Sequence, residues 1–389
     1  MDRMNYPTGR EEHLAAVTGP TGKPPTVLVL GATGYIGGRL TPRLLKAGYR
    51  VRILARSPAR VRAFPWGEEC DVVKGDVLDP VSVRAAMDSV SMIYYLVHSL
   101  ASGRDFEQTD LCAAHVVAHA AARAGVGRII YLGGLHPERT RLSSHLRSRR
   151  DVGQVFLDCT VPALVLQAGV IIGSGSASFE MIRHLTEVLP YMPAPKWVRN
   201  RIQPIAVRDV MHYLLGAARV PKEIDQAVDI GGPDVLTYAQ MMNGYAEAAG
   251  LPRRFIVALP VLTPGLASHW VGLVTPVPRS IARPLVASLE NECIMHSTEI
   301  NGIIPPPPQG LTPYLESIRL ALGRVQKDLV ETSWQDVAVL GAPSAPLPSD
   351  PDWAGRTVYV DQRRMNTTAT VEQLWSVISG GGGLNGWYS

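Results

Sequence analysis

The chain has 389 residues, which is enough for two or three domains. Hydrophobic residues make up 46% of it and charged residues 19%, so the composition supports a large core and excludes a chain that is disordered throughout. The formal net charge of +4 is too small to indicate a protein that binds nucleic acid. The four cysteines show no Cys-x-x-Cys spacing, which argues against a structural zinc site and favours the cytoplasm over secretion.

Neither a signal peptide nor a membrane span is expected. Residues 1–25 contain charged side chains and lack an apolar core, so we expect a disordered tail. No long stretch is apolar and free of charge and proline, so we expect no integral membrane segment. The most apolar segment, residues 255–289, contains prolines and arginines and favours a helix-rich subdomain, as ordinary core or as the wall of an apolar substrate pocket. Peripheral contact with a membrane stays open.

Strand-like apolar runs alternate with helical patterns from Thr26 to about Val170. Near-continuous apolar strands linked by helices are typical of a parallel sheet covered on both faces. The predicted fold class is therefore α/β, a doubly wound parallel Rossmann sheet with a smaller C-terminal helical substrate subdomain. The predicted strands are residues 26–30, 49–54, 71–74, 92–97, 128–133, 163–168 and 227–230, and the predicted helices are 35–47, 81–87, 105–124, 142–157 and 238–248.

The pattern changes after the proline run at residues 305–308. A helix is predicted at 314–323, and the proline-rich sequence between 341 and 352 indicates a linker. Beyond it a strand, a helix and a turn are predicted at 356–367, 371–378 and 380–383, too few elements for an independent core. The expected organisation is a tail at 1–25, a Rossmann domain at 26–323 that includes the substrate subdomain from about 234, a linker at 324–355, and the start of a truncated second domain at 356–389.

A glycine-rich loop joins the first predicted strand to the first predicted helix. Gly31 allows a tight turn out of the strand, Gly34 lets the backbone approach a pyrophosphate, and Gly37 lets the helix pack close to the sheet. The phosphates would lie at the N-terminus of the helix, where unpaired N–H groups and the helix dipole favour anions. The alternative is a merely structural glycine-rich turn. The candidate cofactor-binding residues of the loop are Gly31, Thr33, Gly34, Tyr35, Ile36 and Gly37.

The end of the second predicted strand bears on the choice between NADP(H) and NAD(H). An NAD site places an acid there to accept a hydrogen bond from the ribose 2′-hydroxyl. This chain has Arg56 instead, with Arg60 and Arg39 nearby, and a guanidinium suits a 2′-phosphate. We therefore favour NADP(H) over NAD(H), with solvated surface arginines as the alternative.

Two further strand ends supply candidate cofactor contacts. Asp76 and Val77 follow the third strand, where an acid can accept a hydrogen bond from the adenine amine. The alternative is an acid at a helix N-terminus, a role that Asp79 before Pro80 already fills. Val97 ends the fourth strand, and His98 and Ser99 follow it where such folds approach the nicotinamide ribose, so they are expected to be cofactor contacts rather than catalysts.

These motifs resemble the atypical, extended short-chain dehydrogenase/reductase superfamily. The resemblance is strongest to its NmrA-like NAD(P)H-binding proteins and to relatives of the nucleotide-binding accessory subunit of respiratory complex I. It covers about residues 26–322, implies the Rossmann fold and the cofactor, and does not identify the substrate. The C-terminal piece resembles the start of a domain of unknown function that often follows such Rossmann domains in bacteria. The matching motifs are the glycine loop, Gly75-Asp-Val77, residues 128–133, residues 204–210, Ile230-Gly-Gly-Pro233 and Leu236-Thr-Tyr238.

The superfamily's usual catalytic pair is missing. The resemblance implies a tyrosine that protonates the carbonyl oxygen as the hydride arrives, and a lysine four residues later that lowers the pKa of that tyrosine. This chain contains no Tyr-x-x-x-Lys, and His145 and Arg149 take the two positions. His145 is the candidate proton donor, because an imidazole with a pKa of about 6.5 supplies protons at neutral pH. Arg149 would bind ribose or phosphate, and the alternative is that both residues only line the cofactor site or a helix surface.

The leading functional hypothesis is a cytoplasmic NAD(P)H-dependent reductase of an apolar, easily reduced acceptor such as a quinone. Such an acceptor does not need the usual tyrosine, because the proton can come from water. The alternative is a non-catalytic NAD(P)H-binding sensor or an assembly or regulatory protein. An isomerase or epimerase with tightly bound NAD(P) is a weaker third hypothesis, because it also needs a residue that transfers a proton.

Overall fold

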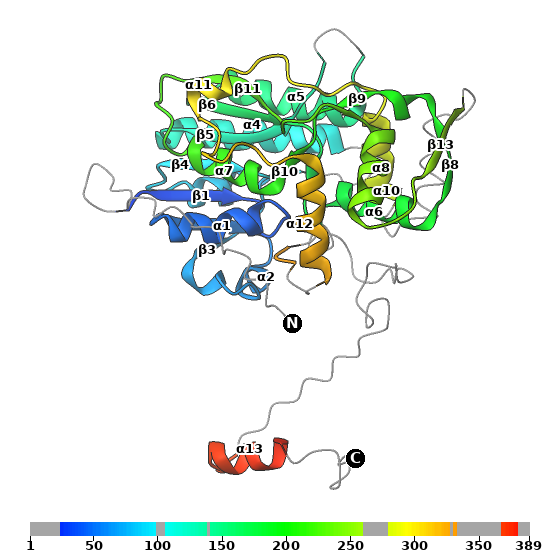
Figure 1. Cartoon of the computed structure of the whole chain (residues 1–389). Helices are drawn as coiled ribbons and strands as arrows, with labels where there is room; N and C mark the ends of the chain where they lie inside the picture. Colours follow the sequence, from blue (N-terminus) through cyan, green and yellow to red (C-terminus); the bar gives the residue numbers. More distant parts are fainter. Residues whose placement is uncertain are drawn as a thin grey trace. The chain divides into compact units, whose positions relative to one another are not determined.

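A seven-stranded parallel sheet forms the centre of the larger part of the molecule (Figure 1). Its strands lie in the order β3-β2-β1-β4-β5-β6-β11, the arrangement of a doubly wound Rossmann sheet. The predicted fold class is confirmed, and each predicted strand of the sheet lies within about two residues of its observed bounds. The strands are β1 (Thr26–Leu30), β2 (Arg50–Ala55), β3 (Asp71–Lys74), β4 (Met92–Tyr95), β5 (Ile129–Gly134), β6 (Ala163–Ala168) and β11 (Gln226–Ile230).

The structure is a computed structural model of the chain. It describes residues 24–98, 106–137, 141–259, 279–326, 330–332 and 367–379. Contacts between residues divide the chain into two units, Met1–Ala354 and Gly355–Ser389. Most of the predicted N-terminal tail, residues 356–366 of the predicted strand and the predicted turn at 380–383 lie outside the described residues.

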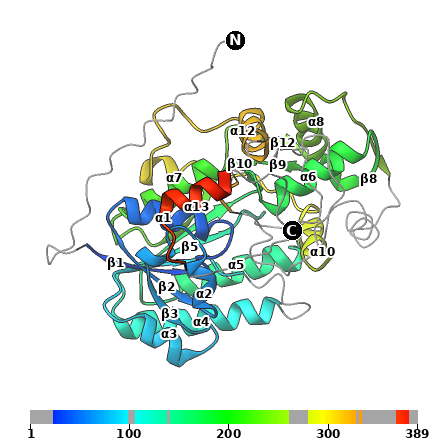
Figure 2. The same cartoon turned by 90° about the horizontal axis from the view of Figure 1, so that it is seen from below.

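Helices cover both faces of the sheet (Figures 1 and 2). Successive side chains of a strand point to opposite faces, and all four residues of Val27–Leu30 are fully buried. Val27 and Val29 share a core with α1 (Gly37–Lys46) and α7 (Val207–Ala217). Leu28 and Leu30 share a second core with α3 (Pro80–Ala86), α4 (Phe106–Ala124) and α5 (Ser144–Leu157). Burial on both faces explains why the strands are apolar without alternation.

A second group of elements packs beside the sheet, on the right in Figure 1. Its core includes Phe179 and Ile182 as well as Tyr238, Met241 and Tyr245. The expected start of the substrate subdomain at about residue 234 therefore misses residues 177–199, because these pack against the later helices. The elements are α6 (Ala177–Val188), β8 (Tyr191–Pro195), η3 (Lys196–Arg199), α8 (Tyr238–Ala248), β13 (Phe255–Leu259), α10 (Arg279–Ser288) and α12 (Tyr314–Gln326).

Short elements complete the larger unit. Asp79 caps α3 by accepting hydrogen bonds from the backbone N–H groups of Val81 and Ser82. The sequence predicted this helix-capping role for Asp79. A capping box formed by Thr237 and Gln240 begins α8. The remaining elements are α2 (Pro58–Arg62), η1 (Gly67–Glu69), β7 (Ile171–Ile172), β9 (Arg201–Ile202), β10 (Ile205–Ala206), β12 (Leu236–Thr237) and α11 (Ile300–Ile303).

Part of the expected linker packs against the Rossmann domain. α12 continues to Gln326, and Thr332 is buried beside the start of α1. The hydroxyl of Thr332 donates to the carbonyl oxygen of Tyr35 over 2.8 Å, and Arg39 donates to the carbonyl oxygen of Thr332 over 3.0 Å. The expected linker boundary at residue 324 is therefore too early.

The smaller unit is described only at residues 367–379, where α13 (Val371–Ser379) lies close to the predicted helix. Thr370 and Gln373 exchange backbone and side-chain hydrogen bonds of 2.9 and 3.3 Å at its N-terminus. Among the described residues of the chain, no helix is both long and apolar enough to cross a membrane.

Candidate functional site

A cavity of about 830 Å³ opens where the parallel strands end. Its lining includes the residues that follow β1, β2, β3 and β4, and also the end of β5. In a doubly wound sheet, ligands bind at this edge, where the strand order reverses between β1 and β4. The cavity then continues between α6, η3, α8 and α10, so that one space joins the sheet to the neighbouring helices.

Every candidate site residue predicted from the sequence lies on this cavity. Segments as distant as the first and fifth strands contribute to it, and the roles of these residues stay predictions. They are Gly31, Thr33, Gly34, Tyr35, Ile36, Gly37, Arg56, Asp76, Val77, Val97, His98, His145 and Arg149.

At two positions of the glycine loop, the neighbouring backbone leaves no room for a side chain. Gly31 has a φ of +88°, and a Cβ on it would lie 2.7 Å from the carbonyl oxygen of Leu96. A Cβ on Gly37 would lie 2.2 Å from the carbonyl oxygen of Gly31. The first turn of α1 contains no acid, and no side chain caps it. These features fit a dinucleotide pyrophosphate, because backbone N–H groups and the helix dipole face the cavity without a competing anion.

The arginines near the end of β2 fall into two groups. Arg56 and Arg60 are exposed and line the cavity. Arg39 is buried, donates to the carbonyl oxygens of Thr332 and Ser174 over 3.0 and 2.9 Å, and lies 4.3 Å from the ring centre of Tyr35. Arg39, named from the sequence as a neighbour of Arg56, therefore has its guanidinium committed to these two carbonyl oxygens.

Asp76 lies at the cavity after β3 and does not cap α3. Its carboxylate accepts a hydrogen bond of 3.0 Å from the backbone N–H of Leu78. Because Asp79 supplies the helix cap, the Asp76 carboxylate can still accept a hydrogen bond from a ligand in the cavity.

His98 is held by a buried carboxylate. Its Nδ1 lies 2.7 Å from Asp110, which also accepts from the Ser148 hydroxyl over 3.2 Å. Burial, followed by the charge of Arg149, lowers the pKa of His98 to about 4, although Asp110 opposes the shift. The ring is therefore neutral at pH 7, with the Nδ1 proton donated to Asp110. Its Nε2 is buried without a hydrogen-bond partner among the described residues.

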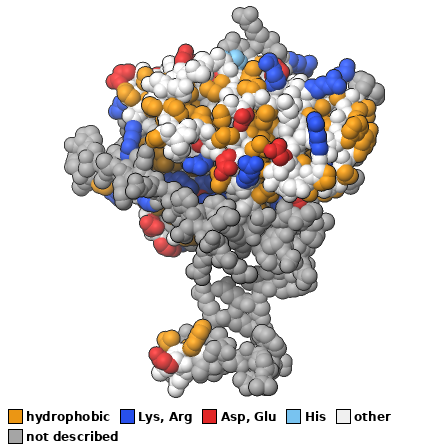
Figure 3. Space-filling model, in the orientation of Figure 1, with side chains coloured by type: hydrophobic (Ala, Val, Ile, Leu, Met, Phe, Trp, Pro, Cys, Tyr) orange, Lys and Arg blue, Asp and Glu red, His pale blue; other side chains and the backbone are white. Residues whose placement is uncertain are grey.

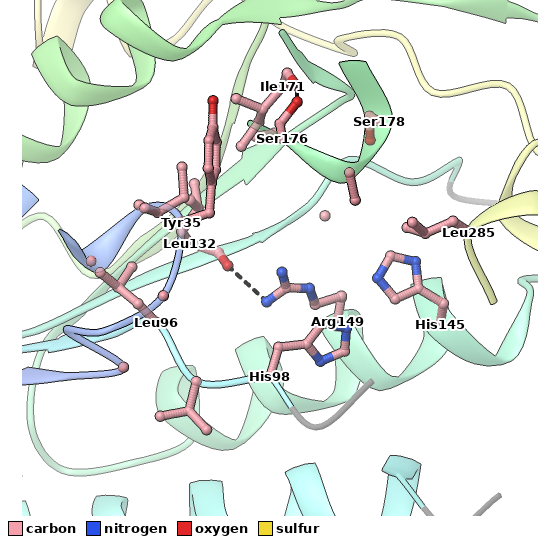
Figure 4. A pocket seen from close by; sticks show the side chains of 18 of the residues that line it. Tyr35, Leu96, His98, Leu132, His145, Arg149, Ile171, Ser176, Ser178 and Leu285 are labelled. Atoms are coloured by element: carbon pink, nitrogen blue, oxygen red, sulfur yellow. Dashed lines mark hydrogen bonds between the residues drawn. The ribbon is translucent and has the colours of Figure 1, made fainter. Parts of the chain in front are cut away.

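His145 and Arg149 lie one turn apart on α5 (Figure 4). His145 Nδ1 lies 2.9 Å from the Ser288 hydroxyl, and its ring centre lies 5.1 Å from that of His98. Burial, followed by electrostatic repulsion from His98 when it is protonated and from Arg149, holds the pKa of His145 well below its usual value. The premise of an imidazole that titrates near neutral pH is therefore not met. Arg149 points toward β5 and donates to the carbonyl oxygen of Leu132 over 3.1 Å.

The far end of the cavity is apolar. Part of the segment 255–289 contributes to it, whereas residues 260–278 lie outside the described residues. The contribution of α6 and η3 was not predicted, and the one sequence signal was the apolar spacing at residues 181, 182 and 185. The lining residues of this end are Met181, Ile182, Leu185, Trp197, Ile202, Tyr238, Met242, Leu285, Val286, Leu289 and Cys293.

Comparison with known proteins identifies a cofactor-binding region. Residues 31–159 match a family described as NAD(P)H-binding. Solved structures with similar folds include the triphenylmethane reductase of a Citrobacter species in complex with NADP(H), with 17% identity, a TM-score of 0.58, and coverage of 76% of this chain and 99% of that one. Another is the enzyme WbmG of Bordetella bronchiseptica in complex with NAD, with 14% identity, a TM-score of 0.59, and coverage of 81% and 98%.

Residues 31–159 match an NAD(P)H-binding family, and the chain shares its fold with the triphenylmethane reductase. The resemblance stated from the motifs is thereby confirmed at the level of fold and cofactor class.

The sequence relatives of this chain differ in size and in name. It is 28% identical to a ceramide reductase of Caulobacter vibrioides over 64% of this chain and 78% of the relative. It is 23% identical to the mitochondrial NADH dehydrogenase (ubiquinone) 1 alpha subcomplex subunit 9 of Arabidopsis thaliana over 67% of each. It is 26% identical over 58% of its length to an uncharacterized protein of Mycobacterium tuberculosis, but spans only 23% of that relative's length.

Proposed function

We propose that the protein is an NADPH-dependent oxidoreductase that reduces an apolar acceptor such as a quinone. The observation that carries the proposal is the single cavity that joins the glycine loop to the apolar end. NADPH, when bound, supplies the hydride. An acceptor in the apolar end would lie against the side chains of Leu185, Met242 and Leu289, which exclude water from the reacting groups.

The preference for NADPH rests on the end of β2. Arg56 and Arg60 are exposed at the cavity, and the loop between β2 and α2 contains no acid. A guanidinium forms charge-assisted hydrogen bonds to a phosphate, whereas the ribose hydroxyl of NADH needs an acceptor. Asp76, Val77, Val97 and His98 are the further cofactor contacts of this proposal.

The state of the histidines favours an acceptor that is protonated from water. Neither His98 nor His145 carries the second ring proton of an imidazolium at pH 7, because burial keeps both rings neutral. The Ser288 hydroxyl donates to the Pro284 carbonyl oxygen over 2.9 Å, so it accepts from His145 Nδ1–H and leaves Nε2 of this ring as a hydrogen-bond acceptor. We propose that Nε2 of His145 accepts a hydrogen bond from the water that protonates the acceptor oxygen, and that Arg149 orients the cofactor ribose.

The test is NADPH oxidation by the purified chain with a panel of quinones of increasing alkyl length. We expect turnover that exceeds the rate without protein and rises with alkyl length. The ceramide reductase among the relatives supports a reductase with a lipid-like substrate. NADPH binding without oxidation by any quinone would contradict the proposal.

That result would favour a non-catalytic NAD(P)H-binding sensor or assembly protein. Two observations support this alternative: the similarity to a subunit of NADH dehydrogenase and the absence of Tyr-x-x-x-Lys from the sequence. In either case we propose a cytoplasmic protein, because all four cysteines are free thiols. We also propose that the smaller unit belongs to a second domain.

A further inference from the structure

The ribbon of β8 and β13 is apolar on both faces. The strands pair in parallel, with Phe255 opposite Tyr191, Val257 opposite Pro193 and Leu259 opposite Pro195. Of these side chains Pro195 is buried and the other five share the outer face, since Met192, Ala194 and Ile256 pack inward. Tyr191 and Phe255 are 55% and 64% exposed and stack with ring centres 5.6 Å apart. A solvent-facing strand usually carries polar side chains at such positions, so this face is unusual.

The inner face of the ribbon backs the apolar end of the cavity. Met192 and Ile256 pack in one cluster with Met181, Leu185 and Met242, and these three also line the cavity. One layer of side chains therefore separates the apolar outer face from the apolar end of the cavity.

Basic side chains border this face. Residues 188–202 and 248–259, which build the ribbon and its flanks, contain five basic residues and no acid. Arg201 pairs with Glu292 over 3.0 Å, and Arg254 is buried and donates to the carbonyl oxygen of Thr186. Lys196, Arg199 and Arg253 remain exposed.

The exposed bases stand at both ends of the ribbon. Lys196 and Arg199 follow β8 directly, and Arg253 precedes β13 and shares a surface hollow with the acid Glu247. In Figure 3, hydrophobic side chains gather at the right edge, where Figure 1 places β8 and β13, and Lys or Arg side chains lie near them.

We infer that the outer face of the β8–β13 ribbon docks on an anionic lipid bilayer. Aromatic rings settle at the level of the lipid headgroups, and each Lys or Arg near the surface of an anionic membrane adds attraction. Phe255 and Tyr191 enter the headgroup region, and Lys196 and Arg199 contact lipid phosphates. A second copy of the chain fits this face less well, because dimerisation would bring two basic borders together. The inference does not depend on the proposed reductase activity.

The experiment is co-sedimentation of the full chain with vesicles of phosphatidylcholine, with and without phosphatidylglycerol. We expect binding to the anionic vesicles, reduced by salt. Lys196→Glu with Arg199→Glu should lower the partition coefficient by roughly fivefold or more for each charge. Tyr191→Ser with Phe255→Ser should lower it by about tenfold or more. The matched controls lie on α3, where Arg84→Glu and Val81→Ser change an exposed base and a 69% exposed apolar side chain.

A second readout does not depend on the serine variants folding. In Phe255→Trp the emission of the new indole should shift to shorter wavelength when anionic vesicles are added, whereas Val81→Trp should show no shift. Equal sedimentation of the ribbon variants and their controls would overturn the inference. So would a lipid-free dimer that Phe255→Ser dissociates, since it would assign the face to a second copy of the chain.

Discussion

The two ends of the cavity differ in what shapes them, which is the backbone at one end and side chains at the other. At the cofactor end the backbone sets the shape, through the φ of +88° at Gly31 and the close approach of Gly37 to the Gly31 carbonyl oxygen. At the apolar end side chains from α6, η3, α8 and α10 set the shape. A backbone cradle accepts a ligand group of fixed geometry, whereas a wall of side chains is altered by single substitutions. Under the proposed function, the first end would therefore fix the class of cofactor, and the second would determine the substrate.

The largest effect is expected at the cofactor end, from Gly37→Ala. The new Cβ would overlap the Gly31 carbonyl oxygen, so the loop must shift, at a cost of about 3 kcal/mol in the free energy of unfolding. We expect NADPH affinity to fall by about 100-fold or more, which corresponds to about 2.7 kcal/mol. Titration calorimetry and urea unfolding measure the two quantities. Gly302→Ala is the matched control, because a Cβ there meets nothing within 4 Å, and an unchanged affinity in Gly37→Ala would remove the cradle from the account.

The pH dependence of the free energy of unfolding tests whether His98, which lines the cavity, is held neutral. The pKa of His98 is about 4 in the folded chain, against about 6.5 when unfolded, so the unfolded chain binds more protons between these values. The stabilisation from neutral His98 is present above pH 6.5 and is lost as the pH falls toward 4. Between pH 7 and pH 4.5 we expect a loss of about 2.5 kcal/mol that is absent in His98→Gln. Urea unfolding at the two pH values measures it, and equal losses in wild type and variant would show that His98 is not held neutral.

Arg56→Ala tests which of the two cofactors the cofactor end prefers. If the guanidinium binds a 2′-phosphate, removing it costs about 2 kcal/mol for NADPH, or roughly thirtyfold in Kd, and leaves NADH almost unaffected. Arg123→Ala, an exposed arginine near the end of α4, serves as the control. Equal losses for the two cofactors would assign Arg56 to the solvated surface.

Leu289→Asn should produce the smallest effect, confined to the apolar end. A polar amide on the cavity wall should raise KM for an alkyl quinone by about tenfold, because it removes apolar contact and needs hydrogen-bond partners. The Kd of NADPH should stay unchanged, and Leu320→Asn on the exposed side of α12 should change neither value. A parallel loss of NADPH affinity in Leu289→Asn would mean that the two ends are not separable.

Sequence alone anticipated the cofactor end because its parts are local. The strand at 26–30, the glycine loop and the helix after it form one continuous stretch, and residues that follow parallel strands must meet at one edge of the sheet. The apolar end comes from segments about 100 residues apart, and no local pattern shows that Met181 and Leu285 line one space. The burial of His145, Arg39 and Thr332 was equally hidden, since each depends on a tertiary neighbour.

The most direct test is a single-turnover experiment in which the chain is loaded with stoichiometric NADPH and mixed with a long-chain benzoquinone. If one cavity brings cofactor and apolar acceptor together, bound NADPH is oxidised and hydroquinone forms in equal amount. Leu289→Asn should then slow the reaction at low quinone concentration without releasing NADPH. Bound NADPH that stays reduced beside an excess of quinone would contradict the account and leave a protein that binds the dinucleotide without using it.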